Sequence, residues 1–141
     1  MRFVIQKHFA RKLHYDLRLE IKGKLKSWAV PKQPDNEKGI KRLAIQTEDH
    51  DLDYLDFEGD IPEGYYGAGK VEIWDKGEYE LEETDNKKLT LEKSISLCGK
   101  ADTFPHKKKI VFNLKGKKLK GKFCLLKFEK TGKDNWLFFK I

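Results

Sequence analysis

The chain is poor in cysteine, with only Cys98 and Cys124, and it contains no long apolar run. The two cysteines form no metal-type pair, and nothing in their spacing suggests a disulfide framework. A membrane-spanning helix needs roughly 18 apolar residues, and no signal peptide opens the sequence. We therefore expect a soluble, cytoplasmic protein that has no membrane partner.

Acidic residues are outnumbered, because 23 Asp and Glu face 30 Lys and Arg, which gives a net charge of +7. This excess favours a polyanionic partner such as nucleic acid, although charge alone supports only steering and non-specific binding. Aromatic residues make up 12% of the chain, which argues against disorder. The length suits one domain, so residues 1–141 are interpreted as a single folded unit.

Apolar and polar residues alternate over much of the chain, as they do in strands with one buried face. The alternation predicts strands at 3–8, 13–21, 25–30, 41–48, on both sides of KGKKLKG within 109–130, and at 135–141. Some eight short strands with frequent turn signals predict a mostly β fold, a compact antiparallel barrel or sandwich with little helix.

Three segments are predicted to differ from this simple pattern. Residues 70–82 are expected to form a hairpin that turns at Asp75-Lys76-Gly77. Residues 49–69 are rich in acids, glycine and tyrosine and are expected to form an ordered loop. One helix is expected from about Asn86 to Leu97.

Histidine is scarce, with four residues, yet two of them lie close to an aspartate in QKHFARKLHYDLRLE at 6–20. His14 and Asp16 occupy alternate positions of a predicted strand and therefore share one face. His8 lies six residues before His14, and FARKL between them gives the chain room to bring both imidazoles together. Two neutral imidazoles and one carboxylate make a metal site with positions left for water or substrate. The alternative is a set of ordinary polar residues on an exposed strand.

Positive side chains accompany these candidate ligands. Arg18 lies one strand step beyond Asp16, Arg42 shares a face of the predicted strand 41–48 with Glu48, and Lys32 follows Trp28 in a proline-flanked turn. Arginine offers a planar fork to two phosphate oxygens, whereas lysine offers a point charge. An anionic substrate would explain this pattern. The alternative is routine surface pairing with nearby carboxylates, namely those of Glu20, Glu48 or Asp49.

His50 follows Glu48 at strand spacing, and an imidazole near a phosphate can act as a general acid or a transition-state donor. Its alternative is a loop histidine that caps an acidic turn. Tyr54 could hydrogen-bond a phosphate oxygen or simply pack. His106 has no companion ligands and is expected at the surface. The glycine-rich EGYYGAG at 63–69 is interpreted as structural turns, because no GK[ST] follows it.

The sequence closely resembles the 3'-phosphoesterase domain of bacterial ligase D proteins of non-homologous end joining, and stand-alone archaeal homologues of that domain. The matching blocks cover nearly the whole chain: FVIQKHFARKLHYDLRLE, LKSWAVPKQP, KRLAIQTEDHDLDYLDFEGDIPEGYYGAGKVEIWDKG, LKGKKLKGKF and the final WLFFK. The resemblance implies a compact β-barrel with a crescent-shaped groove and a site that depends on Mn²⁺, with other divalent transition metals as alternatives.

The resemblance also implies roles for individual residues. The family's metal ligands fall on His8, His14 and Asp16. Its catalytic and phosphate-contacting residues fall on Arg18, His50 and Tyr54, with Lys32, Arg42 and Glu48 also in the site. Family enzymes trim a 3'-terminal ribonucleotide from a primer strand and then remove the remaining 3'-phosphate, which leaves a 3'-OH that can be ligated.

Two departures from the family pattern affect these expectations. The chain begins seven residues before His8, whereas bacterial domains carry a charged N-terminal arm, so we expect ribonucleotide trimming to be affected more than phosphate removal. Neither a ligase nor a polymerase module is attached, so coupling to sealing is expected to run through separate proteins. Two other functions fit the residues: a non-catalytic nucleic-acid-binding barrel, and a phosphodiesterase for small nucleotides.

Overall fold

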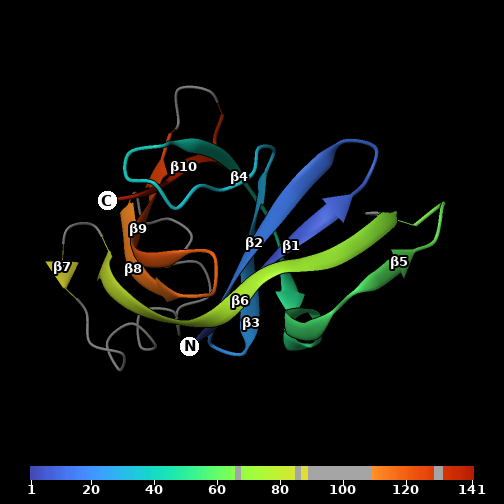
Figure 1. The fold of residues 1–141 in the computed structure, drawn as a ribbon, viewed down its shortest axis with the longest axis horizontal. Helices are drawn as coiled ribbons and strands as arrows, with labels where there is room; N and C mark the ends of the chain where they lie inside the picture. The colour runs from blue at the N-terminus through green and yellow to red at the C-terminus, as the bar shows by residue number, and fades with distance from the viewer. Residues whose placement is uncertain (66–67, 85–86, 89–108, 129–131) are drawn as a thin grey trace.

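The computed structural model describes residues 1–65, 68–84, 87–88, 109–128 and 132–141. This part of the chain forms ten strands and one short 3-10 helix, η1, which are drawn in Figure 1. Their bounds are β1 Arg2–Phe9, β2 Leu13–Ile21, β3 Lys24–Val30, β4 Arg42–Asp51, η1 Leu52–Asp56, β5 Gly59–Ile61, β6 Gly69–Thr84, β7 Lys87–Lys88, β8 Lys109–Lys115, β9 Lys120–Lys127 and β10 Asn135–Lys140.

Eight of these strands close into an antiparallel barrel, which confirms the predicted barrel of about eight strands. Neighbouring strands follow the order β1-β2-β3-β4-β10-β9-β8-β6, and β6 pairs back with β1 to complete the ring. β5 and β7 each pair with β6 outside this ring. Closure matters because it pairs the backbone groups that an open sheet would leave exposed at its edges.

Large apolar side chains fill the barrel interior. Leu17 and Leu19 of β2 are fully buried there, on the face of the strand opposite Asp16, as the alternation predicts. Trp28 and Trp136 meet edge to face across the interior with ring centroids 5.9 Å apart. The apolar face of β2 is therefore fixed by the core, and its polar face is turned outward.

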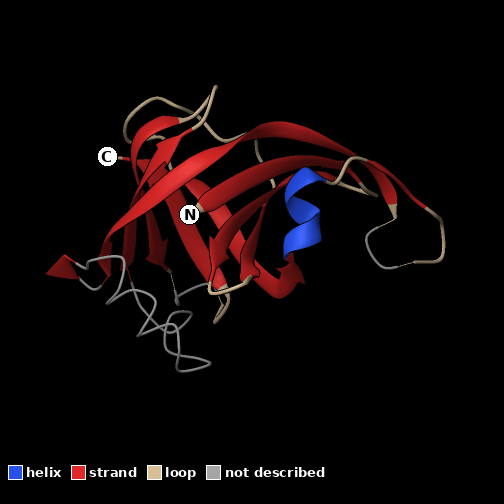
Figure 2. Cartoon of the chain, turned by 90° about the horizontal axis from the view of Figure 1, so that it is seen from below, coloured by secondary structure: helices blue, strands red, loops and turns tan. Residues whose placement is uncertain are grey.

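A second, smaller apolar cluster attaches η1 to the outer face of the barrel. Val4 of β1, Leu25 of β3 and Leu55 of η1 are buried together. Figure 2 shows the helix lying against the layer of strands. β6 is 16 residues long and continues with β1 and β2 past the barrel, where it pairs with β5 to form an arm (Figure 1). The helix thus lies beside the outward polar face of β2.

The predicted hairpin at 70–82 is wrong, because these residues belong to one continuous strand, β6. Asp75 does not begin a turn of its own: its buried carboxylate accepts backbone N–H groups from Lys117, Lys118 and Leu119 in the turn between β8 and β9. Gly77 lies against the backbone of Lys115, where a Cβ would not fit. The turn-like sequence of β6 therefore packs closely against the β8–β9 hairpin.

One further prediction is corrected, and another lies mostly outside the described residues. The loop expected at 49–69 contains η1 and β5, because Leu55 has an apolar cluster to pack against. Of the helix expected from Asn86 to Leu97, Lys87–Lys88 form the short strand β7, and the other residues lie outside the described part of the chain, as does His106. The helix that the structure describes, η1, is too short to cross a membrane.

Candidate metal and phosphate site

The β1–β2 hairpin brings the first two histidines side by side. His8 and His14 are direct cross-strand partners, and their ring centroids lie 4.7 Å apart. Asp16 is opposite Gln6, one step along the same face. Because side chains alternate between the faces of a strand, the three candidate ligands all project away from the core.

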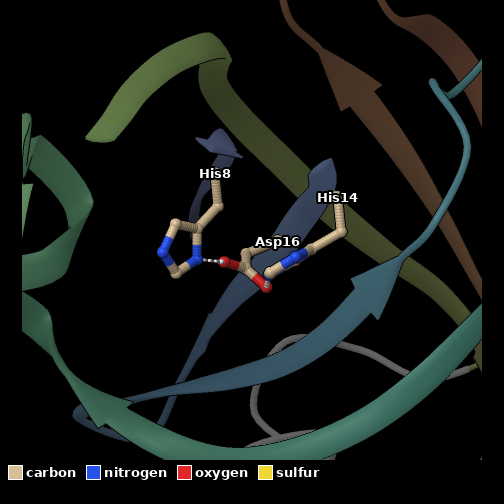
Figure 3. A group of neighbouring side chains, drawn as sticks. All are labelled: His8, His14 and Asp16. Atoms are coloured by element: carbon tan, nitrogen blue, oxygen red, sulfur yellow. Dashed lines mark ion pairs between the residues drawn. The ribbon is translucent and has the colours of Figure 1, made fainter. Parts of the chain in front are cut away.

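The Asp16 carboxylate lies between the two imidazoles, as Figure 3 shows. Its Oδ2 is 3.4 Å from His8 Nδ1, and its Oδ1 is 3.2 Å from His14 Nε2. One ligand atom from each residue lies within 4.8 Å of the other two. His8 and Asp16 are buried, whereas His14 is half-buried at the end of the hairpin.

The chemistry of this donor set fits a divalent cation. His14 Nδ1–H donates to the carbonyl of Lys12 at 3.1 Å, which in the neutral imidazole leaves the lone pair of Nε2 directed at Asp16 Oδ1. Two lone pairs that face each other at this distance require a proton or a metal ion between them. A backbone carbonyl that orients a ligand histidine in this way is typical of metal sites. Nitrogen and oxygen donors of this kind suit Mn²⁺, Zn²⁺ and related ions.

Protonation of the triad follows the same geometry. The hydrogen bond to Asp16 raises the pKa of His14, although burial opposes the shift. Burial acts to raise the pKa of Asp16, but hydrogen bonds to His14 and His8 and the charge of Arg18 outweigh it and hold that pKa well below its usual range. The carboxylate is therefore ionised at neutral pH and available to a cation.

Arg18 lies beneath the triad, almost fully buried, and is held by several neighbours. Its Nε donates to Gln6 Oε1 at 2.7 Å, and its Nη1 donates to Ser27 Oγ at 2.8 Å. Nη2 lies 3.5 Å from Asp16 Oδ2. Gln6 also donates from Nε2 to the carbonyl of Tyr54 at 2.7 Å, and so connects Arg18 to η1. The result is a fixed positive charge on the floor of the site.

Sequence reasoning missed Gln6 and Ser27 as site residues. Gln6 is completely buried and lies two positions before His8, on the same face of β1. A polar residue at that alternate position was the available signal for Gln6. Ser27 gave no signal, because only the pairing of β2 with β3 sets it opposite Arg18.

A bulge in β4 turns His50 toward Arg18. Ser27 pairs with Thr47 but Leu25 pairs with His50, so β4 carries one extra residue between these pairs. His50 Nδ1 lies 3.0 Å from Arg18 Nη1 and 3.0 Å from the carbonyl of Glu48. Burial and the charge of Arg18 lower the pKa of His50, so its ring is neutral at pH 7.

Tyr54 completes the same wall from η1. Its ring centroid lies 4.8 Å from that of His50, and the guanidinium carbon of Arg18 lies 5.1 Å from the Tyr54 ring centroid. The helix therefore contributes both an aromatic surface and a phenol to the site.

These groups line one cavity of about 550 Å³. It contains seven of the predicted site residues: His8, His14, Asp16, Arg18, Glu48, His50 and Tyr54. Arg42 and Lys32 do not line it. Arg42 Nε donates to the carbonyl of Gln33 at 2.8 Å, and Lys32 is exposed in the loop after β3. The structure thus assembles the Asp16 carboxylate, three imidazoles and a buried guanidinium in a single pocket, together with the carboxylates of Glu48, Asp49 and Asp51.

Comparison with known proteins identifies the family. Residues 6–127 match the model of the DNA ligase D 3'-phosphoesterase domain. The chain belongs to this family. Membership confirms the resemblance drawn from the sequence and implies hydrolase activity on phosphate esters.

Relatives of this 3'-phosphoesterase domain occur in multifunctional proteins. The chain is 45% identical over 138 residues to the multifunctional non-homologous end joining protein LigD of Pseudomonas aeruginosa. The aligned residues make up 98% of this chain and 14% of that protein. It is 43% identical over 139 residues to the multifunctional non-homologous end joining DNA repair protein LigD of Mycobacterium tuberculosis, covering 99% of the chain and 16% of that protein. The chain therefore spans about one-seventh of the length of these relatives.

Proposed function

We propose that this chain is a Mn²⁺-dependent phosphoesterase that repairs the 3' ends of nucleic acids in DNA end joining. It would remove 3'-terminal ribonucleotides and 3'-phosphates and leave a 3'-OH that can be ligated. The observation that carries the proposal is the convergence of His8, His14 and Asp16 on one point above the buried Arg18. The family match and the names of the relatives support the end-joining context.

In this proposal His8, His14 and Asp16 would hold the cation. A divalent ion bound there would polarise a phosphate oxygen and lower the pKa of a coordinated water toward about 7. Arg18 keeps a positive charge next to that position without reorganisation, because Gln6 and Ser27 fix its guanidinium. The protein thus contributes a prepared electrostatic environment for a phosphate with developing negative charge.

His50 and Tyr54 are proposed to act on the substrate oxygens. The described hydrogen-bond contacts of His50 all use Nδ1, so Nε2 is the ring nitrogen left to donate to, or accept from, a phosphate or leaving oxygen. A neutral imidazole suits either role near pH 7. Glu48 lies at the exposed rim of the cavity, and Arg42 and Lys32 are proposed to contact phosphates from outside it.

The proposed partners are nucleic-acid 3' ends and separate ligase and polymerase proteins. The net charge of +7 supports attraction to the phosphate backbone without sequence readout. Sealing requires a 3'-OH, so the product of this reaction is the substrate that a ligase consumes.

One assay tests the proposed function against its rivals. A primer–template with a 3'-phosphate, a 2',3'-cyclic nucleotide and a plain duplex are each incubated with and without Mn²⁺. We expect Mn²⁺-dependent release of inorganic phosphate from the first substrate alone. Hydrolysis of the cyclic nucleotide alone would point to a small-nucleotide phosphodiesterase, and binding without any hydrolysis would leave only a nucleic-acid-binding barrel.

The affinity for Mn²⁺ is expected to depend on pH through His14. A proton on this imidazole competes with the cation, and its raised pKa extends the competition toward neutral pH, whereas ionised Asp16 adds none there. Affinity should rise by about tenfold per pH unit on the acidic side of the His14 pKa and level off above it. Titration of the metal-free protein with Mn²⁺, followed by electron paramagnetic resonance between about pH 5.5 and 8.5, measures this. An affinity that is constant over this range would contradict the assignment.

A further inference from the structure

The extension of β1 and β2 beyond the barrel exposes side chains on the face that is core elsewhere. Ile5 of β1 is completely buried in the interior, whereas Phe9, at the end of the same strand, is 39% exposed. Leu13, the cross-strand partner of Phe9, is 44% exposed. His8 and His14 alternate with these residues, so the exposed apolar face lies opposite the proposed metal ligands.

Five side chains on this face form a continuous row, which we call the back-face ladder: Phe9, Lys7, Tyr15, Trp74 and Lys118. Lys7 Nζ lies 5.1 Å from the ring centroid of Phe9 and 6.0 Å from that of Tyr15. The rings of Tyr15 and Trp74 meet edge to face at 5.7 Å, and Lys118 Nζ lies 4.7 Å from the Trp74 centroid. Tyr15 is buried and connects the ladder to the core, while Trp74 is half-buried.

The ladder carries positive charge that no described carboxylate neutralises. Lys7 and Lys118 lie over aromatic rings and form no ion pair with the described residues. Lys24 and Lys115, by contrast, bind Asp51 and Glu80.

Two carboxylates lie near the ladder. The buried Asp75 carboxylate accepts the backbone N–H groups of Lys117, Lys118 and Leu119 and forms no ion pair with the Lys118 ammonium group. Glu72 is the cross-strand partner of Lys7, but its Oε1 binds the neighbouring Lys70 at 3.0 Å. This pair is close to neutral as a unit, so the excess charge of the face is that of the two ladder lysines.

We propose that the back-face ladder binds single-stranded nucleic acid. Exposed aromatic rings accept bases of any identity by stacking, and cations between them attract the phosphates. Phe9 and Trp74 supply the ring surfaces, and Lys7 and Lys118 supply the charges. The inference rests on the proposed function, because a strand that passes over the tip of the β1–β2 hairpin would contact the metal ligands on one face and the ladder on the other.

Binding to a labelled strand tests the proposal without catalysis. The full chain in EDTA is titrated against a fluorescein-labelled oligothymidylate that ends in 3'-OH, and anisotropy is recorded at several salt concentrations. Phe9→Ala should weaken binding about tenfold, as loss of one stacked base does. Lys118→Gln should weaken binding and reduce the slope of log affinity against log salt by about one.

Matched control variants lie on other surfaces. Lys133→Gln removes an exposed lysine that has no ion pair among the described residues, and Leu126→Ala truncates an apolar side chain that is 37% exposed. Both should bind the strand as the unmodified chain does. Thermal unfolding of each variant confirms that it is folded. Losses in these controls equal to the losses in the ladder variants would overturn the proposal.

Tryptophan fluorescence locates the contact. Trp28 and Trp136 are completely buried, so Trp74 is the tryptophan that a stacked base can quench. Trp74→Phe keeps an aromatic ring and should abolish the quenching. Three results would each overturn the proposal. They are quenching that persists in Trp74→Phe, unchanged strand binding by Phe9→Ala, and a dimer that Phe9→Ala converts to a monomer. Because the strand has no 3'-phosphate and no metal is added, absence of phosphate release in the separate assay would overturn the proposed function only.

Discussion

Replacing His14 or Asp16 by alanine is expected to abolish release of inorganic phosphate from a primer that ends in a 3'-phosphate. Each substitution removes one of three groups that converge on the proposed cation. A cation at the phosphate supplies several kcal/mol of charge stabilisation in the transition state, so activity should fall by about 10³-fold or more. Mn²⁺ binding should fall with activity, and electron paramagnetic resonance measures it on the same samples.

The matched control is Asp134→Asn, which changes an exposed carboxylate just before β10. It should retain both Mn²⁺ binding and phosphate release. His14 is half-buried at the end of a hairpin, so thermal unfolding of His14→Ala should remain cooperative and show that the loss is chemical. Full activity in either ligand variant would remove the metal from the proposed mechanism.

Replacing Arg18 by alanine is expected to lower the free energy of unfolding by about 3 kcal/mol or more and to remove activity. The guanidinium is almost fully buried, and its loss leaves Gln6 Oε1 without its donor and removes one of the groups that stabilise the Asp16 charge. Ser27 Oγ loses a donor as well. Buried polar groups left without partners carry the full desolvation penalty. Urea denaturation measures the change in stability.

Arg2→Ala provides the comparison, because Arg2 also pairs with a carboxylate, that of Glu20, through two hydrogen bonds, but its side chain is 55% exposed. An exposed pair of this kind contributes little to stability, because solvent screens it. Arg18→Lys should remain inactive, since a lysine keeps the charge but cannot donate to Gln6 and Ser27 in the same planar geometry. Similar stability losses for the Arg18 and Arg2 variants would contradict the buried role.

The arrangement of the β1–β2 hairpin could be predicted because its signals are local. Alternation over residues 13–21 separates Asp16 from Leu17 and Leu19, and the short connection after His8 limits where the first strand can lie. The pairing of His8 with His14 follows once the hairpin closes. Proximity in sequence thus determined most of the proposed metal centre.

The rest of the cavity depends on contacts between distant residues. Strict alternation would put the His50 side chain on the face of β4 that carries Ala44 and Gln46, and this face is turned to the core. Only the bulge in β4 places His50 beside Arg18. In β6, Asp75 and Gly77 resemble a turn signal, but Asp75 accepts a hydrogen bond from the β8–β9 turn and Gly77 packs against the backbone of Lys115. A local pattern does not contain these partners, so it could not reveal either outcome.

The sequence by itself determined the strand periodicity, the family and the proposed ligand trio, because all three depend on residue types at short, fixed spacing. Tertiary structure decided that Gln6 and Ser27 hold Arg18, that η1 presents Tyr54 to His50, and that Phe9 and Leu13 at the back of the hairpin are exposed. The physical reason is barrel closure. It brings strands far apart in the chain into register, and a buried charge then takes its partners from whichever residues that register places around it.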